Sequence, residues 1–240
     1  MDFIAGYIAC GFILVFAIIL SIFAQAKVTG TFSRYSEVPS SFDMTGAELA
    51  EKLAYEKGVN INIGVCRGQL TDHYNSRTKT LNISEANYNS KSLAAHAIVA
   101  HEFGHALQDK ENYAPLKIRQ IVISVSNIIS SLLLPIIIVG LLLEFLFFTI
   151  AGPIIIYAYV GIYAVAVIAS LVTLPVEFNA SSRAKKLLFD MGATSQEEVE
   201  GTGNLLNAAA MTYVASLLVS LAYFIRILFI LLSVTKRDRY

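Results

Sequence analysis

The sequence predicts a mainly α-helical membrane protein with about four transmembrane helices and a small α+β domain at the membrane surface. The chain of 240 residues is 55% hydrophobic with a mean hydropathy of +0.61, which is more apolar than a soluble domain of this length. Several apolar stretches are each long enough for the roughly 20 helical residues that cross a bilayer core. Between them lie two polar blocks, and the longer block contains segments with the alternation of β-strands.

The apolar stretches are candidate membrane spans, and they cover residues 3–24, 120–143, 151–174 and 208–234. The first stretch has no Lys or Arg before it and is longer than a signal-peptide core, so we expect a retained anchor. Arg226 interrupts the last stretch, which makes it either a full crossing or a membrane-associated helix. The predicted organisation is an anchor (1–26), a first polar part (27–119), a transmembrane hairpin (120–174), a second polar part (175–207) and a last helix with a basic tail (208–240).

The positions of Lys and Arg predict the orientation in the membrane. The 18 basic residues balance 18 acidic ones, so the net charge gives no reason to expect nucleic acid as a partner. The N-terminus and the turn at 144–150 contain no basic residue, although three follow the last span. We expect both polar blocks to face the cytoplasm, because they contain the basic residues near the first three spans: Lys27, Arg34, Lys117, Arg119, Arg183, Lys185 and Lys186.

The first polar block is predicted to fold as a helix, a β-hairpin and a second helix. Thr45 followed by Glu48 is a capping box, and Gly58 is a helix stop, which together predict a short amphipathic helix. The segments 59–66 and 78–84 alternate apolar and polar residues and are joined by turn-forming residues, so a hairpin is expected. From Ser92 to about Asp109 the apolar residues recur with a helical period.

The second of these helices contains His101, Glu102 and His105 in the pattern H-E-x-x-H. A spacing of four residues stacks two imidazoles on one face, where they can bind one zinc ion per chain. Glu102 is then placed to act as general base on the zinc-bound water. A third ligand is required, and Glu177 is a candidate: Pro175 suits a helix start or a kink, and Glu177 stands in the first turn after it. Its spacing alone is equally consistent with an ordinary glutamate that favours the helix dipole.

The chain resembles the YugP-type family of membrane-bound neutral zinc metallopeptidases over nearly its whole length. The segments that carry the resemblance are LTDHYNSRTKTLNIS, AIVAHEFGHALQDKENYAPLKIR, LVTLPVEFNASSRAKKLL and LLNAAAMTYVASLL, in this order. The layout is also similar to the HtpX-type and CAAX-protease-type membrane gluzincins, in which two spans separate H-E-x-x-H from the ligand glutamate. The resemblance implies a gluzincin-like zinc domain in which His101, His105 and Glu177 bind the metal.

The function expected from this resemblance is that of a zinc-dependent endopeptidase that hydrolyses membrane-associated or unfolded polypeptides. We expect an integral protein of a bacterial-type plasma membrane, with the lipid bilayer and polypeptide substrates, including membrane proteins, as partners. The alternative is a non-catalytic zinc-binding membrane adaptor or chaperone. Glu102 favours hydrolysis over this alternative, because a purely structural site does not need a general base.

Residues outside the ligand set are assigned further roles. Gluzincins often place an Asp four residues after the ligand Glu, but here that position is Ser181, so Ser181, Asn179 or a backbone carbonyl is expected to orient His101. His73 lies in the predicted hairpin turn, where it is a candidate donor to the oxyanion or simply part of an exposed turn. An extended substrate is expected to pair with an edge strand that includes Thr78, Lys79, Thr80 and Leu81.

Overall fold

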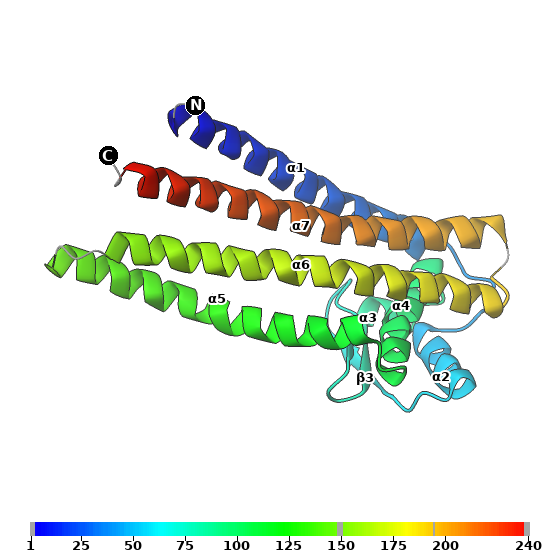
Figure 1. Cartoon of the computed structure of the whole chain (residues 1–240). Coiled ribbons are helices and arrows are strands. Elements are labelled where there is room, and N and C mark those ends of the chain that lie inside the picture. The colour runs from blue at the N-terminus through cyan, green and yellow to red at the C-terminus, as the bar shows by residue number, and fades with distance from the viewer. Residues whose placement is uncertain (1–2, 148–150, 194, 238–240) are drawn as a thin grey trace. The chain divides into compact units, whose positions relative to one another are not determined.

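The computed structural model describes residues 3–147, 151–193 and 195–237, and these form helices and one small sheet (Figure 1). The elements follow one another as α1 (Phe3–Ser36), α2 (Gly46–Lys57), β1 (Asn62–Cys66), β2 (His73–Asn75), β3 (Thr80–Ser84), α3 (Glu85–Tyr88), α4 (Leu93–Lys110), α5 (Ala114–Phe147), α6 (Ala151–Asp190) and α7 (Gln196–Arg237). The fold is therefore mainly helical, as the composition predicts.

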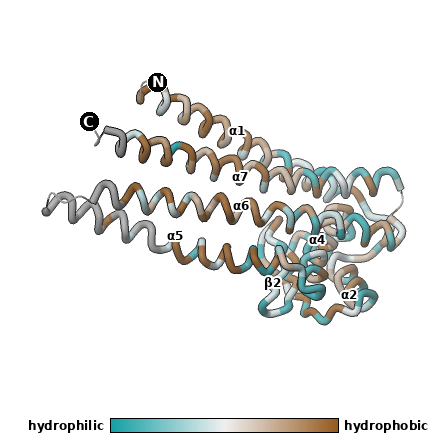
Figure 2. The backbone as a smooth tube through the Cα atoms, in the orientation of Figure 1, coloured by the Kyte–Doolittle hydropathy of each residue, from teal (hydrophilic) through white to brown (hydrophobic). Residues whose placement is uncertain are grey.

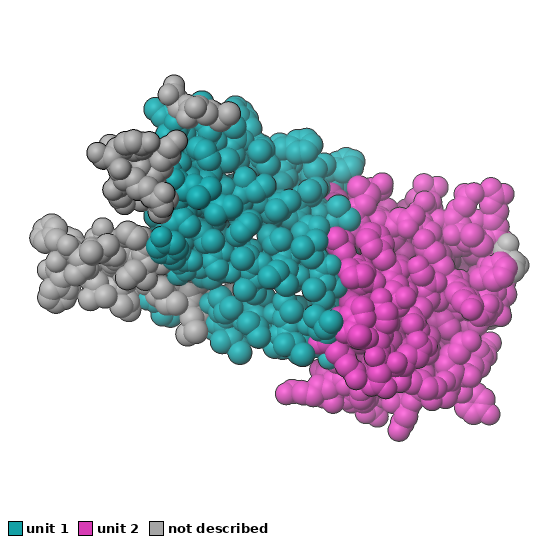
Figure 3. All heavy atoms as spheres, viewed as in Figure 1, with its two compact units in different colours: residues 1–23, 118–173, 213–240 teal, residues 24–117, 174–212 magenta. Residues whose placement is uncertain are grey.

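The chain divides into two compact units (Figure 3). Unit 1 consists of residues 1–23, 118–173 and 213–240, and unit 2 consists of residues 24–117 and 174–212. The helices of unit 1 are largely hydrophobic, whereas the polar segments of the chain gather in unit 2 (Figure 2). All candidate metal ligands lie in unit 2.

In unit 1, α1 packs against α7 through apolar residues. Leu14 and Ala17 of α1 form a buried cluster with Ala222 of α7. Nearer the N-terminus of α1, the ring of Phe229 lies against Gly6, so a side chain at position 6 would displace this ring. The guanidinium of Arg226 is 4.7 Å from the centre of the Tyr7 ring and donates a hydrogen bond to its hydroxyl, which gives this charge a partner within the helix pair.

Three of the described helices are long and apolar enough to cross a membrane. They lie at Phe3–Ser36, Ile155–Asp190 and Gln196–Ser233. They correspond to the first, third and fourth apolar stretches of the sequence, and the last of them includes Arg226. The remaining expected span, residues 120–143, falls in α5, where many of the side chains lie outside the described residues, and it stays a prediction.

In unit 2, the ends of α2 confirm the expected caps. The Thr45 hydroxyl accepts from the backbone N–H of Glu48, and the Glu48 carboxylate accepts from the N–H of Thr45 at 2.7 Å. Gly58 ends the helix in the left-handed conformation, with φ of 59°. The apolar face of α2 then packs on α4 and the sheet through Leu49 and Leu53, which are fully buried.

The sheet corrects the hairpin expected from residues 59–84. It contains three strands in the order β1-β3-β2, with β1 parallel and β2 antiparallel to β3. The connection between the two expected strands itself contains β2, which pairs antiparallel with β3. Asp72, just before β2, accepts from the N–H of Ser84 at the end of β3 at 2.8 Å. β1 and β3 therefore run in the same direction, and the true hairpin is formed by β2 and β3.

The core of unit 2 encloses α4, so His101, Glu102 and His105 on this helix are shielded from solvent. Phe103 and Val99 of α4 pack with residues of α2, β3 and the last turns of α6, notably Leu81, Ala184 and Leu187. Gly104 permits the close approach of α4 and α6, because a Cβ at this position would lie 2.8 Å from the backbone oxygen of Ala180. The sequence of α4 thus brings its histidine face against α6.

Candidate metal site

Two histidines on successive turns of α4 form the first half of the candidate metal site. The helix begins at its N-cap Ser92, whose hydroxyl accepts from the N–H of Ala95, and it continues to Lys110. Within it His101 and His105 are four residues apart, with ring centres separated by 5.0 Å. His105 is buried and His101 is half-buried. His96 points elsewhere, because its Nε2 donates a hydrogen bond to the carbonyl oxygen of Met44 at 2.7 Å.

Glu177 supplies the second half from α6, though from a different position in the helix than expected. Of the two roles that the sequence suggests for Pro175, a helix start or a kink, the start is excluded, because α6 runs from Ala151 to Asp190 with Pro175 inside it. Glu177 is therefore in the helix interior and not in a first turn, so the helix-dipole explanation of this residue is wrong. The residue is 2% exposed, and a carboxylate buried this deeply is almost always paired.

The three side chains converge on one point. Glu177 Oε2 lies 3.2 Å from His101 Nε2 and 3.6 Å from His105 Nε2. One ligand atom from each of these residues can be chosen so that all lie within 4.8 Å of one another. Neutral imidazole nitrogens and a carboxylate present lone pairs, which attract a cation when they face one another, and two His with one Glu is a common catalytic zinc set. The residues present therefore fit a zinc ion.

Glu102 follows His101 on α4 and is held by the sheet. Its Oε2 accepts a hydrogen bond from the backbone N–H of Tyr74 in β2, at 3.0 Å. Burial raises the pKa of the Glu102 carboxyl above its ordinary value, against the lowering effect of His105 and His101. A carboxylate with a raised pKa is a stronger proton acceptor, as a general base requires.

His105 is also shifted, in the direction set by its acidic neighbours. Burial lowers the pKa of His105, but the interaction with Glu177 and the charge of Glu102 outweigh burial, so the net change is upward. The site thus combines two carboxyl groups and two imidazoles whose charges depend on one another.

Two further hydrogen bonds reach the outer ring nitrogens of the histidines. Ser181 Oγ lies 3.2 Å from His101 Nδ1, in the place where the sequence suggests an orienting group. Asn179 contacts Gln108 and Arg183, and no described hydrogen bond joins it to either histidine. Gln108, which sequence reasoning missed, lies 2.9 Å from His105 Nδ1. The available signal was a polar residue three positions after His105, on the same helix face.

The remaining predicted site residues lie in or near the sheet. His73 is the first residue of β2, and its ring nitrogens lie near the carbonyl oxygen of Thr71 and the Asn82 amide, at 2.9 and 3.1 Å. The proposed contact with the oxyanion stays a prediction.

The segment assigned to substrate pairing is not a free edge. Thr80 and Leu81 belong to β3, the central strand, and Leu81 is fully buried. Thr78 and Lys79 precede that strand in the β2–β3 turn, where Lys79 pairs with Asp109 at 2.5 Å. The expectation of an edge strand here is wrong, because β1 and β2 occupy both sides of β3, so the assignment of these residues to substrate binding loses its premise.

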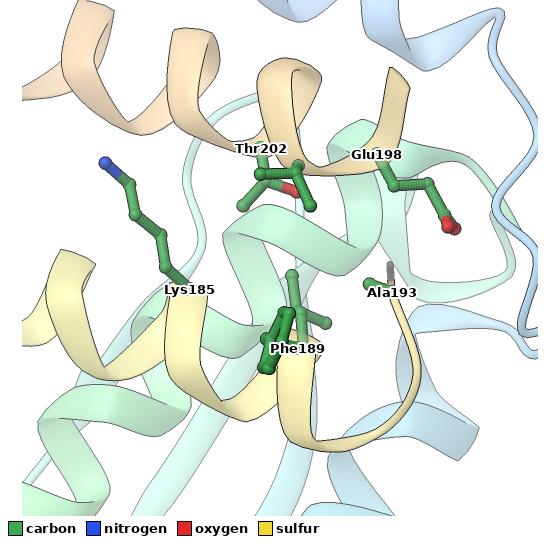
Figure 4. A pocket seen from close by; sticks show the side chains of 7 residues that line it. Lys185, Phe189, Ala193, Glu198 and Thr202 are labelled. Atoms are coloured by element: carbon green, nitrogen blue, oxygen red, sulfur yellow. The ribbon is translucent and has the colours of Figure 1, made fainter. Parts of the chain in front are cut away.

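A separate cavity of about 240 Å³ lies in unit 2 between the end of α6 and the start of α7 (Figure 4). Its lining is mostly apolar and includes Phe189, Val199 and Thr202, with Lys185 and Glu198 on opposite sides of the group (Figure 4). It shares no residue with the His101, His105 and Glu177 set. The candidate metal site, on the facing sides of α4 and α6, is therefore distinct from this cavity.

The fold and the site together define a helical membrane protein with a buried site of the H-E-x-x-H type. Residues 10–232 match the sequence profile of the family described as "Putative neutral zinc metallopeptidase". The chain is 38% identical to the Bacillus subtilis (strain 168) protein named "Putative membrane protease YugP" over 228 residues. The aligned region covers 95% of this chain and 97% of the relative. The chain therefore belongs to this zinc metallopeptidase family. No solved structure matches it significantly.

Proposed function

We propose that the protein is a zinc-dependent endopeptidase of the membrane that hydrolyses peptide bonds of membrane-associated or unfolded polypeptides. The observation that carries the proposal is the convergence of His101 Nε2, His105 Nε2 and Glu177 Oε2, with Glu102 on the same turn of α4. A ligand set of two His and one Glu leaves a fourth position open for chemistry, whereas structural zinc sites are closed by protein ligands.

In this proposal each residue of the site has one task. His101, His105 and Glu177 would hold a zinc ion, which would supply Lewis acidity toward a scissile carbonyl and a water molecule. Glu102 accepts a proton from the attacking water at its carboxylate and returns it to the departing amine. The N–H of Tyr74 keeps the Glu102 carboxylate in one orientation before the proton is transferred.

The Tyr74 contact is itself supported by a second layer of interactions. The Tyr74 hydroxyl donates to Asp109 Oδ2 at 2.7 Å, and Lys79 pairs with the same oxygen. Burial and the neighbouring Asp109 raise the pKa of the Tyr74 hydroxyl, so it remains a donor at neutral pH. These bonds hold β2 against α4, which favours a fixed position for Glu102.

The test is hydrolysis by the purified full chain in detergent. We expect the zinc-loaded protein to cleave unfolded polypeptides, to lose this activity when a chelator removes the metal, and to regain it when zinc is added back. Bound zinc with no cleavage of a broad panel of unfolded substrates would contradict the proposal and favour the non-catalytic adaptor or chaperone.

We also propose that unit 2 faces the cytoplasm, from the Lys and Arg near the first three spans. Cys66 is half-buried in β1 and can report this, because the other cysteine, Cys10, is buried in α1. In intact bacterial cells we expect a membrane-impermeant thiol reagent to leave Cys66 unmodified until the cells are permeabilised. A Cys66→Ser protein measures the background, and a cysteine introduced in place of Lys186 provides a second reporter. Modification of either reporter in intact cells would invert the proposed orientation.

A further inference from the structure

We infer that Gln108 is a positioning residue that determines which ring nitrogen of His105 faces the metal site. The inference rests on the proposed zinc site, but it does not depend on peptidase activity. Gln108 lies three residues after His105 on α4 and is fully buried. A buried carboxamide needs partners for both its oxygen and its amino group, because unpaired polar atoms in the interior are strongly unfavourable.

The contacts of Gln108 define the orientation of its amide. Its Nε2 lies 2.8 Å from the backbone carbonyl oxygen of Val176. A carbonyl oxygen can only accept a hydrogen bond, so the atom of Gln108 at this position must be the amino group that donates. The oxygen Oε1 is therefore the atom that lies 2.9 Å from His105 Nδ1.

Asn179 supports the same orientation from the other side. Arg183 Nε, which can only donate, lies 2.7 Å from Asn179 Oδ1. This oxygen also accepts from Gln108 Nε2 at 2.9 Å. Arg183 in turn pairs with Glu111, the C-cap residue of α4, at 2.7 Å. If the Gln108 amide turned over, it would lose its hydrogen bonds to both Val176 and Asn179.

The network leaves His105 with one favourable tautomer. Because Gln108 Oε1 can only accept, the proton of the neutral ring is on Nδ1. The lone pair is then on Nε2, which is the nitrogen that lies 3.6 Å from Glu177 Oε2. A zinc ion binds the lone-pair nitrogen, and the partner of the other ring nitrogen selects the tautomer.

Gln108 also connects the two helices that bear the ligands. Its amino group bonds to Val176 and Asn179, which stand immediately before and two residues after Glu177 on α6. The same side chain thus orients the ring of His105 and holds the turn of α6 that presents Glu177. A residue that merely filled the core would not need this combination of one acceptor and two donor contacts.

The inference is tested by the zinc affinity of the purified full chain in detergent, measured by competition with a chelator. We expect Gln108→Met, which has similar length but no acceptor for Nδ1, to lower the affinity by about 10–100-fold. Gln108→Glu keeps an oxygen for Nδ1 but loses both donor contacts, to Val176 and Asn179, so it should recover only part of this loss. Gln196→Met is the matched control, because Gln196 is exposed in the first turn of α7, and its affinity should equal that of the wild type.

A spectroscopic readout separates positioning from a general loss of packing. Nitrogen NMR of the imidazole groups should find the Nδ1–H form of His105 in the wild type and a mixture of tautomers in Gln108→Met. Retention of either the wild-type affinity or the wild-type tautomer in a folded Gln108→Met protein would overturn the inference. Affinities and tautomers that change as expected, in a protein whose wild type cleaves no peptide, would support the role of Gln108 and reject the peptidase proposal.

Discussion

Replacing Glu102 by Gln is expected to leave zinc bound and to lower peptide hydrolysis by about 10²–10⁴-fold, the usual contribution of a general base. The amide has the shape of the carboxylate and can still accept the hydrogen bond from the N–H of Tyr74, which Glu102 accepts at 3.0 Å. It cannot accept a proton from water at neutral pH. The measurement is the rate of cleavage of one unfolded substrate at equal zinc content in both proteins.

The control for this variant is Glu51→Gln. Glu51 is an exposed residue of α2, outside the candidate metal site, so the same chemical change there should not alter the rate. A zinc-loaded Glu102→Gln protein that cleaves at the wild-type rate would show that Glu102 is not the base.

Replacing Glu177 by Ala is expected to weaken zinc binding by more than about 100-fold, because even loss of an outer hydrogen-bonding partner typically weakens it 10–100-fold. Activity should be lost together with the metal. The reason is geometric: Glu177 Oε2 is the only carboxylate oxygen of the convergent set in the described residues, 3.2 Å from His101 Nε2. The measurement is metal content after dialysis, together with the dissociation constant from chelator competition.

Glu51→Ala is the matched control for this loss, since it removes a carboxylate of the same length from an exposed helix face. Thermal unfolding monitored by circular dichroism should establish that the Glu177→Ala protein is folded. Wild-type zinc affinity in that folded protein would exclude Glu177 as a ligand.

The local sequence was sufficient to predict α2 and α4, two helices of unit 2 near the site. The capping box at Thr45 and Glu48 and the stop at Gly58 define α2 as expected. The helical period from Ser92 onward likewise places His101 and His105 on one face of α4. These features depend on residues a few positions apart, and the interactions that determine them are contained in the segment itself.

Features that depend on distant segments could not be derived in this way. The alternation of residues 78–84 indicates a strand but does not say which strands lie beside it, and β1 was expected to pair antiparallel to β3 although it is parallel. Pro175 suggests a helix start or a kink, and α6 continues through it. The role of Gln108 could not be predicted either, because it depends on a hydrogen bond to the backbone carbonyl of Val176 in a distant segment.

The separation of the ligands along the chain has a consequence for biogenesis. His101 and Glu177 meet across 76 residues of sequence, and their helices touch where Gly104 lies against Ala180. During synthesis from the N-terminus, the nascent chain carries the histidine pair and Glu102 well before α6 exists. The full ligand set therefore assembles only after the intervening residues have been made and α6 has docked on α4.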